Sequence, residues 1–110
     1  MNSILATIKR MLGDDETYEH FNAEIITHIN SALSILTQLG VGPKTGFMIT
    51  GSEQTWSDLV PDRDDVEFIK SYIYLKVKLV FDPPSVSSAL DAMKETIKEY
   101  ESRIQIAFDS

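Results

Sequence analysis

The stretch DDVEFIKSYIYLKVKLVFDPP, residues 64–84, decides the fold. Its apolar residues recur every three or four positions, and this spacing predicts a helix over 64–81. Acidic residues at its start and lysines toward its end suit the two poles of the helix dipole. Asp62 or Asp64 can cap the first turn, and Asp82-Pro83-Pro84 ends the helix because proline cannot continue it.

This helix carries two apolar stripes, whereas a surface helix normally carries one. The first stripe consists of Val66, Ile69, Ile73, Val77 and Val80, and the second consists of Phe68, Tyr72, Leu75 and Leu79. Two alternatives exist for the second stripe: it lies partly at a contact with another subunit, or it packs beneath the segments 3–12 and 47–56. Trp56, the lone tryptophan, is either a core residue or an interface anchor. We take the second stripe and Trp56 as the candidate interface.

Helical periodicity extends outward to three other segments, which are 3–12, 22–39 and roughly 86–106. Their first turns have candidate capping residues, namely Asn2 or Ser3, Asn22, and Ser85. Gly13 and Gly40 can end the first two helices because glycine adopts the left-handed backbone conformation without strain.

The segment 43–56 lacks helical periodicity, and it predicts a short hairpin or an ordered loop. Thr55 and Asp58 have capping-box-like spacing, so 56–60 predicts a short helical turn. The sequence therefore predicts an all-α fold, a small bundle of four to five helices with a short hairpin or ordered loop around 46–56. The length of 110 residues fits a single domain over 1–110.

Composition excludes several classes of function. The chain has no cysteine, so disulfide and thiol chemistry are absent. Its N-terminus lacks the apolar run of a signal peptide, and no stretch is long and apolar enough for a bilayer, so we expect a soluble protein without membrane contact. The net charge is −7, and residues 14–67 hold eleven acids against Lys44 and Arg63. Without a basic stripe, we expect no sequence-specific nucleic-acid binding.

Candidate chemical sites are few. Glu16, His20 and Glu24 are spaced four residues apart, and so are Glu24 and His28. On one continuous helix these side chains could hold a metal ion, but the chain around 18–22 is better explained as a connection into the second helix. Asp62-Arg63-Asp64-Asp65 lacks the glycine and distal glutamate of a calcium loop and is better explained as a helix-capping cluster. The sequence also lacks a nucleophile elbow and a phosphate-binding loop. We therefore expect no catalytic residues, no metal and no cofactor.

Two runs of sequence resemble a known family. They are INSALSILTQLGVGP, residues 29–43, and SYIYLKVKLVFDPP, residues 71–84, and the segments 4–13 and 56–58 are similar as well. Nearly the whole chain resembles the phage and prophage family of head–tail connector (adaptor) proteins, which belong to long-tailed bacteriophages. The second run, a helix with tyrosines and lysines that leads into Asp-Pro-Pro, is the most specific part.

This resemblance implies a non-enzymatic virion protein at the head–tail junction, made in the cytoplasm of the bacterial host. Such subunits form a dodecamer-like ring under the portal protein, extend the DNA channel, and receive neighbouring connector or tail proteins. Many are monomers or smaller oligomers in solution. A ring requires two different contact surfaces on each subunit, and the helix 64–81 with its two apolar stripes can supply one.

Two alternatives compete with the connector hypothesis. The chain could be a small prophage-encoded acidic binding or regulatory module that masks a basic partner protein, a role that its net charge would serve. A small enzyme is the second alternative, and it would require an ordered metal or a cleft with converging polar groups.

Overall fold

A computed structural model describes residues 3–15, 17–60 and 66–108 of the chain. The described residues form five helices: α1 (Ile4–Met11), α2 (Asn22–Gln38), α3 (Trp56–Leu59), α4 (Val66–Phe81) and α5 (Ser87–Phe108). The predicted all-α fold is confirmed, and its loop alternative holds for the segment before α3. Asp62, Arg63, Asp64 and Asp65, with the predicted capping cluster, lie outside the described residues.

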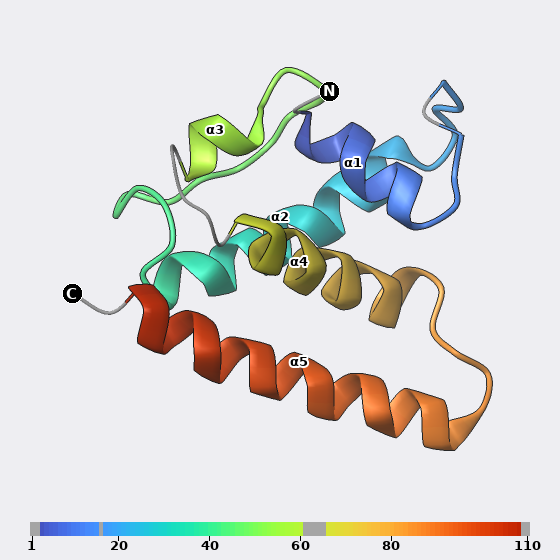
Figure 1. Cartoon of the computed structure of the whole chain (residues 1–110). Coiled ribbons are helices and arrows are strands. Elements are labelled where there is room, and N and C mark those ends of the chain that lie inside the picture. The colour runs from blue at the N-terminus through green and yellow to red at the C-terminus, as the bar shows by residue number, and fades with distance from the viewer. Residues whose placement is uncertain (1–2, 16, 61–65, 109–110) are drawn as a thin grey trace.

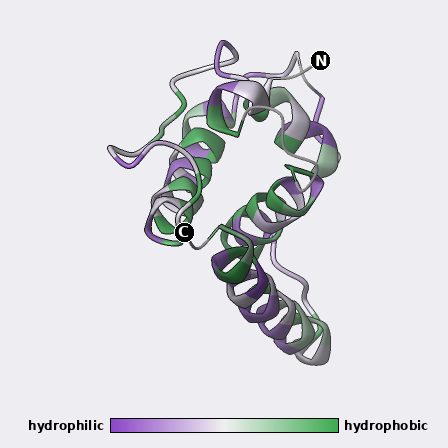
Figure 2. Ribbon diagram, turned by 60° about the vertical axis from the view of Figure 1, so that its left-hand side comes forward, coloured by the Kyte–Doolittle hydropathy of each residue, from purple (hydrophilic) through white to green (hydrophobic). Residues whose placement is uncertain are grey.

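Three long helices alternate in direction, as Figure 1 shows: α2 runs one way, α4 returns, and α5 runs with α2. Helix α4 contacts α1, α2 and α5, whereas α5 packs chiefly against α4. Buried aliphatic residues of α1, α2 and α4 build the core, among them Ile8, Ile29, Leu36, Ile69 and Ile73. Figure 2 shows that α5 is more hydrophilic along its length than its neighbours, and only Ile97 and Ile104 are buried among its described side chains.

Local sequence explains several helix ends. The Ser3 side chain accepts a hydrogen bond from the Ala6 backbone nitrogen and caps α1, as one of the two predicted caps. Thr55 and Asp58 form the predicted capping box at α3, because each side chain binds the other residue's backbone nitrogen. Gly40 has a φ of 98°, the left-handed conformation expected just after α2.

The prediction that Asn22 caps α2 is wrong. The helix begins at Asn22, and Phe21 occupies the cap position without a side-chain hydrogen bond. The helical hydrogen bonds begin one residue earlier than predicted, since the Ile25 backbone nitrogen donates to the Phe21 carbonyl at 2.9 Å, and Phe21 therefore takes the cap position. The Asn22 amide oxygen is buried and has no hydrogen-bond partner.

The hairpin alternative for 43–56 is also wrong. Within the described chain, β pairing is limited to a single antiparallel bridge between Ser3 and Thr55. The Asn30 side chain on α2 takes the place of a partner strand: its amide nitrogen donates to the Ile49 carbonyl at 3.0 Å, and its oxygen accepts from the Ile49 backbone nitrogen at 2.8 Å. The Asn30 side chain thus satisfies both backbone groups of Ile49 without a second strand, and the segment is an ordered loop.

Candidate interface

Helix α4 places its first stripe in the core. Ile69, Ile73 and Val77 are fully buried, Val66 is partly buried, and Val80 at the C-terminal end is 58% exposed. These side chains face the α1 and α2 side of the molecule, where the core aliphatic residues gather. The first stripe is therefore the core-facing side of an amphipathic helix, except at its last residue, Val80, which is exposed.

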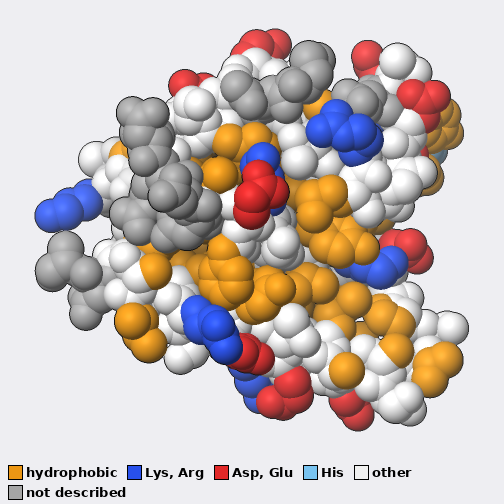
Figure 3. Space-filling view, viewed as in Figure 1, with side chains coloured by type: hydrophobic (Ala, Val, Ile, Leu, Met, Phe, Trp, Pro, Cys, Tyr) orange, Lys and Arg blue, Asp and Glu red, His pale blue; other side chains and the backbone are white. Residues whose placement is uncertain are grey.

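The second stripe contacts α5, a neighbour that neither sequence alternative named. The rings of Phe68 and Tyr100 have centroids 4.4 Å apart. The Tyr72 side chain is fully buried, and its hydroxyl donates a 2.7 Å hydrogen bond to Glu101 Oε2. Leu75 and Leu79 are partly buried against the core. Figure 3 shows hydrophobic side chains along the seam between α4 and α5. Phe68, Leu75 and Leu79 are each only partly buried, so part of this stripe is open to solvent.

Tyr72 has an unusual ionisation equilibrium. Burial raises its pKa far above the ordinary value of a tyrosine, and the hydrogen bond and negative charge of Glu101 raise it further. All three effects act against the tyrosinate form. The hydroxyl therefore remains a hydrogen-bond donor that ties α4 to α5, and it is not poised to lose a proton.

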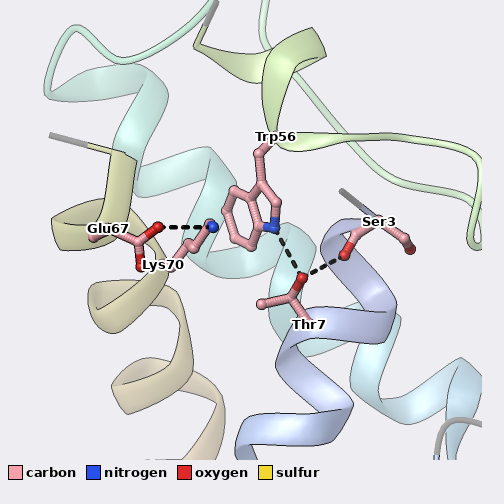
Figure 4. A network of polar contacts seen from close by, with 5 residues as sticks. All are labelled: Ser3, Thr7, Trp56, Glu67 and Lys70. Atoms are coloured by element: carbon pink, nitrogen blue, oxygen red, sulfur yellow. Dashed lines mark hydrogen bonds and ion pairs between the residues drawn. The ribbon is translucent and has the colours of Figure 1, made fainter. Parts of the chain in front are cut away.

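Trp56 lies at the centre of a polar network that joins three helices (Figure 4). Its side chain is only 4% exposed, and Nε1 donates to Thr7 Oγ1 on α1 at 3.0 Å. Thr7 in turn donates to the Ser3 carbonyl at 2.7 Å. Lys70 Nζ on α4 lies 5.5 Å from the centre of the indole ring and pairs with Glu67 at 3.0 Å. The indole is therefore occupied by contacts within the chain.

The candidate metal residues do not converge. His28 Nε2 lies 3.7 Å from Glu24 Oε2, and the His20 ring instead stacks against Phe21 at a centroid distance of 4.8 Å. Glu16 lies outside the described residues. In the part of the chain that the structure describes, no three His, Asp or Glu side chains gather closely enough to hold a metal ion.

Two hollows open on the described surface. A groove of about 920 Å³ runs between α2 and the loop residues 45–48, with hydroxyl and amide side chains on its helix side. A smaller hollow of about 310 Å³ lies between Phe68 and the last turns of α5. Neither hollow follows from helical periodicity: the larger one needs the loop 45–48 to lie along α2, and the smaller one needs the start of α4 to meet the end of α5.

These observations define a small all-α protein with a network of packing contacts and open apolar surface at α4 and α5. A model of the phage connector protein family matches residues 4–110, which is nearly the whole chain. The chain therefore belongs to the phage connector protein family, a family of phage structural proteins. No curated protein and no solved structure gave a match. None of the described helices is long and apolar enough to cross a membrane.

Proposed function

We propose that the chain is a ring subunit that joins the phage head to the tail beneath the portal protein and extends the DNA channel. The family match over residues 4–110 carries this proposal. A channel lined by acidic subunits would let DNA pass without binding it, and the net charge of −7 is consistent with that use. The partners are sister subunits, the portal protein and the next connector or tail protein, and the place of action is the virion.

The contact surface of this proposal is the open part of the second stripe. Phe68, Leu75 and Leu79 are partly buried in the subunit and leave apolar surface for a partner. Tyr72 and Trp56 are buried within the subunit, so we do not expect either side chain to touch a partner directly. The interface assignment is thus narrower than the stripe predicted from sequence.

The test is a pull-down with the portal protein of the same phage, followed by electron microscopy of the complex. We expect a ring of the chain on the portal. Leu79→Asp should abolish portal binding or ring formation while the circular dichroism spectrum stays helical. Ala92→Asp, on an exposed position of α5, is the matched control and should bind normally. If the wild-type chain fails to bind the portal, the proposed function is wrong.

A further inference from the structure

Five of the seven exposed large hydrophobic side chains among the described residues lie at two opposite ends of the molecule, and Met11 and Val86 are the other two. At one end, which we call the aromatic end, lie Tyr18, Phe21 and Val80, with exposed fractions of 49%, 37% and 58%. Phe21 precedes α2 and contacts Phe81 at the C-terminal end of α4, with ring centroids 5.5 Å apart. Tyr18 contacts Phe21 at 6.0 Å. These contacts make Tyr18, Phe21 and Phe81 neighbours, and the exposed Val80 directly precedes Phe81 at the same end of α4.

The opposite end, which we call the loop end, exposes Met48 by 66% and Ile106 by 76%. Here the chain after α2 meets the end of α5, since a Cβ at Gly40 would lie 2.8 Å from the Phe108 carbonyl oxygen. The smaller hollow opens at this end, where Ile106 lines it together with Phe68. The larger groove, which Met48 lines, runs along α2 from Thr27 and reaches this end at Gln38. The alternating directions of α2, α4 and α5 in Figure 1 separate the two ends.

The two ends differ in charge as well as in shape. Near the aromatic end, the described residues of 13–24 carry four carboxylates, those of Asp14, Asp15, Glu19 and Glu24, and this segment has neither lysine nor arginine. Lys9 Nζ donates to the Tyr18 carbonyl at 2.5 Å, so one lysine of α1 offsets part of this negative charge. Residues 39–52, at the loop end, contain Lys44 as their one charged residue. Arg103 lines the smaller hollow and also pairs with Glu99 at 2.7 Å. Two aromatic ends would bring carboxylates together, whereas an aromatic end facing a loop end brings carboxylates to a lysine.

We propose that the aromatic end of one copy packs against the loop end of a second copy, with aromatic side chains entering the hollow beside Ile106. The proposal rests on the ring function proposed above, because it names the partner surfaces of that ring. A contact between two different surfaces repeats from copy to copy, and it closes into a ring when the rotation between copies allows. A contact of one end with itself would stop at a dimer.

Cysteine cross-linking tests this contact, because the native chain has no cysteine. Full-length Val80→Cys protein is mixed with equimolar, tagged Ile106→Cys protein at high concentration and oxidised. We expect the mixed disulfide dimer to exceed both homodimers. Pairing Val80→Cys with Glu95→Cys, at an exposed site on α5, is the matched control and should give only chance cross-links.

Several results would overturn the proposal. A dominant Val80→Cys homodimer would show a symmetric contact instead, and a mixed dimer no more abundant than the Glu95→Cys control would show that the ends do not meet. The portal pull-down separates this inference from the proposed function. If cross-linking fails while the chain still binds the portal, the surfaces are wrong and the function stands. If the ends cross-link but the portal is not bound, the contact stands without that function.

Discussion

Tyr72 shows how burial turns a common side chain into a fixed hydrogen-bond donor. Its hydroxyl binds Glu101 Oε2 at 2.7 Å, and the surrounding helices exclude water from its ring. A hydrogen bond to a charged acceptor contributes about 1.5–3 kcal/mol net, more than a bond between neutral groups. This contact fixes the position of α5, which has few other buried side chains.

We expect Tyr72→Phe to lower the free energy of unfolding by about 1–2 kcal/mol, because Glu101 loses its donor while the ring volume is kept. Guanidinium unfolding followed by circular dichroism measures the loss. Glu101→Gln retains a carbonyl acceptor and is the matched control, with a smaller expected loss. A Tyr72→Phe variant as stable as the wild type would show that this hydrogen bond adds nothing.

The same residue makes stability depend on alkaline pH. The folded-state pKa of Tyr72 is raised, so its stabilising contribution is fully present below the unfolded-state pKa, about 10, and is lost as pH rises above it. The unfolded chain releases the proton first, which favours unfolding. We therefore expect wild-type stability to fall more steeply above about pH 10 than that of Tyr72→Phe. Equal slopes in unfolding curves would contradict this expectation.

Thr7 supplies the partner of the buried indole. Thr7→Val keeps the shape of the side chain but leaves Trp56 Nε1 without its 3.0 Å acceptor, and an unpaired buried donor costs about 1–3 kcal/mol. Thr7→Ser retains the hydroxyl and should cost less. Trp56 is the only tryptophan, so its fluorescence during chemical unfolding reports the loss directly. Identical stabilities for the valine and serine variants would show that the hydrogen bond from Trp56 to Thr7 does not stabilise the fold.

At the scale of helices and loops, the features that depend on residues close together in the sequence were predicted best. The capping box at Thr55 and Asp58 and the left-handed Gly40 follow from short-range chemistry, and both are confirmed. Asn22 failed as a cap because the helical hydrogen bonds begin at the Phe21 carbonyl, one residue earlier than predicted. The hairpin failed because its hydrogen-bond partner, Asn30, is 19 residues away from Ile49. A partner distant in sequence leaves no local pattern to detect.

Gly40 combines backbone and packing constraints. Gly40→Ala places a Cβ in a left-handed conformation and 2.8 Å from the Phe108 carbonyl oxygen, so the end of α5 must shift. Gly13→Ala, at a φ of 83°, meets nothing within 4 Å and tests the backbone cost alone. That cost is about 1–2 kcal/mol, and we expect Gly40→Ala to exceed it. Thermal unfolding compares the two, and an equal loss would show that α5 adjusts freely.

The sequence predicted the candidate interface only in part. Periodicity shows that Phe68, Tyr72, Leu75 and Leu79 share a face of α4, but it does not say which neighbour covers that face. The structure gives α5 as the neighbour at Phe68 and Tyr72. The two hydrophobic ends could not be predicted, because each joins segments that only the alternating helix directions bring together.

At the scale of the whole molecule, the net negative charge opposes the association of copies. The uneven distribution of that charge favours one orientation of the contact between them. Copies with a net charge of −7 repel one another, and Lys44 at the loop end offsets only a small part of that repulsion. Screening lengths fall from about 10 Å at 0.1 M salt to about 3 Å at 1 M. Because the repulsion between whole subunits reaches farther than one local attraction, we expect salt to strengthen self-association in sedimentation experiments.

Lys44→Glu separates the local effect from the global one. It adds negative charge at the loop end, where the carboxylates of residues 13–24 would approach in a head-to-tail contact. Lys94→Glu makes the same change in net charge on an exposed position of α5. We expect Lys44→Glu to weaken association more than Lys94→Glu at low salt, and the two to converge at high salt as screening removes the difference. Equal weakening at low salt would mean that only net charge matters and that Lys44 does not orient the contact.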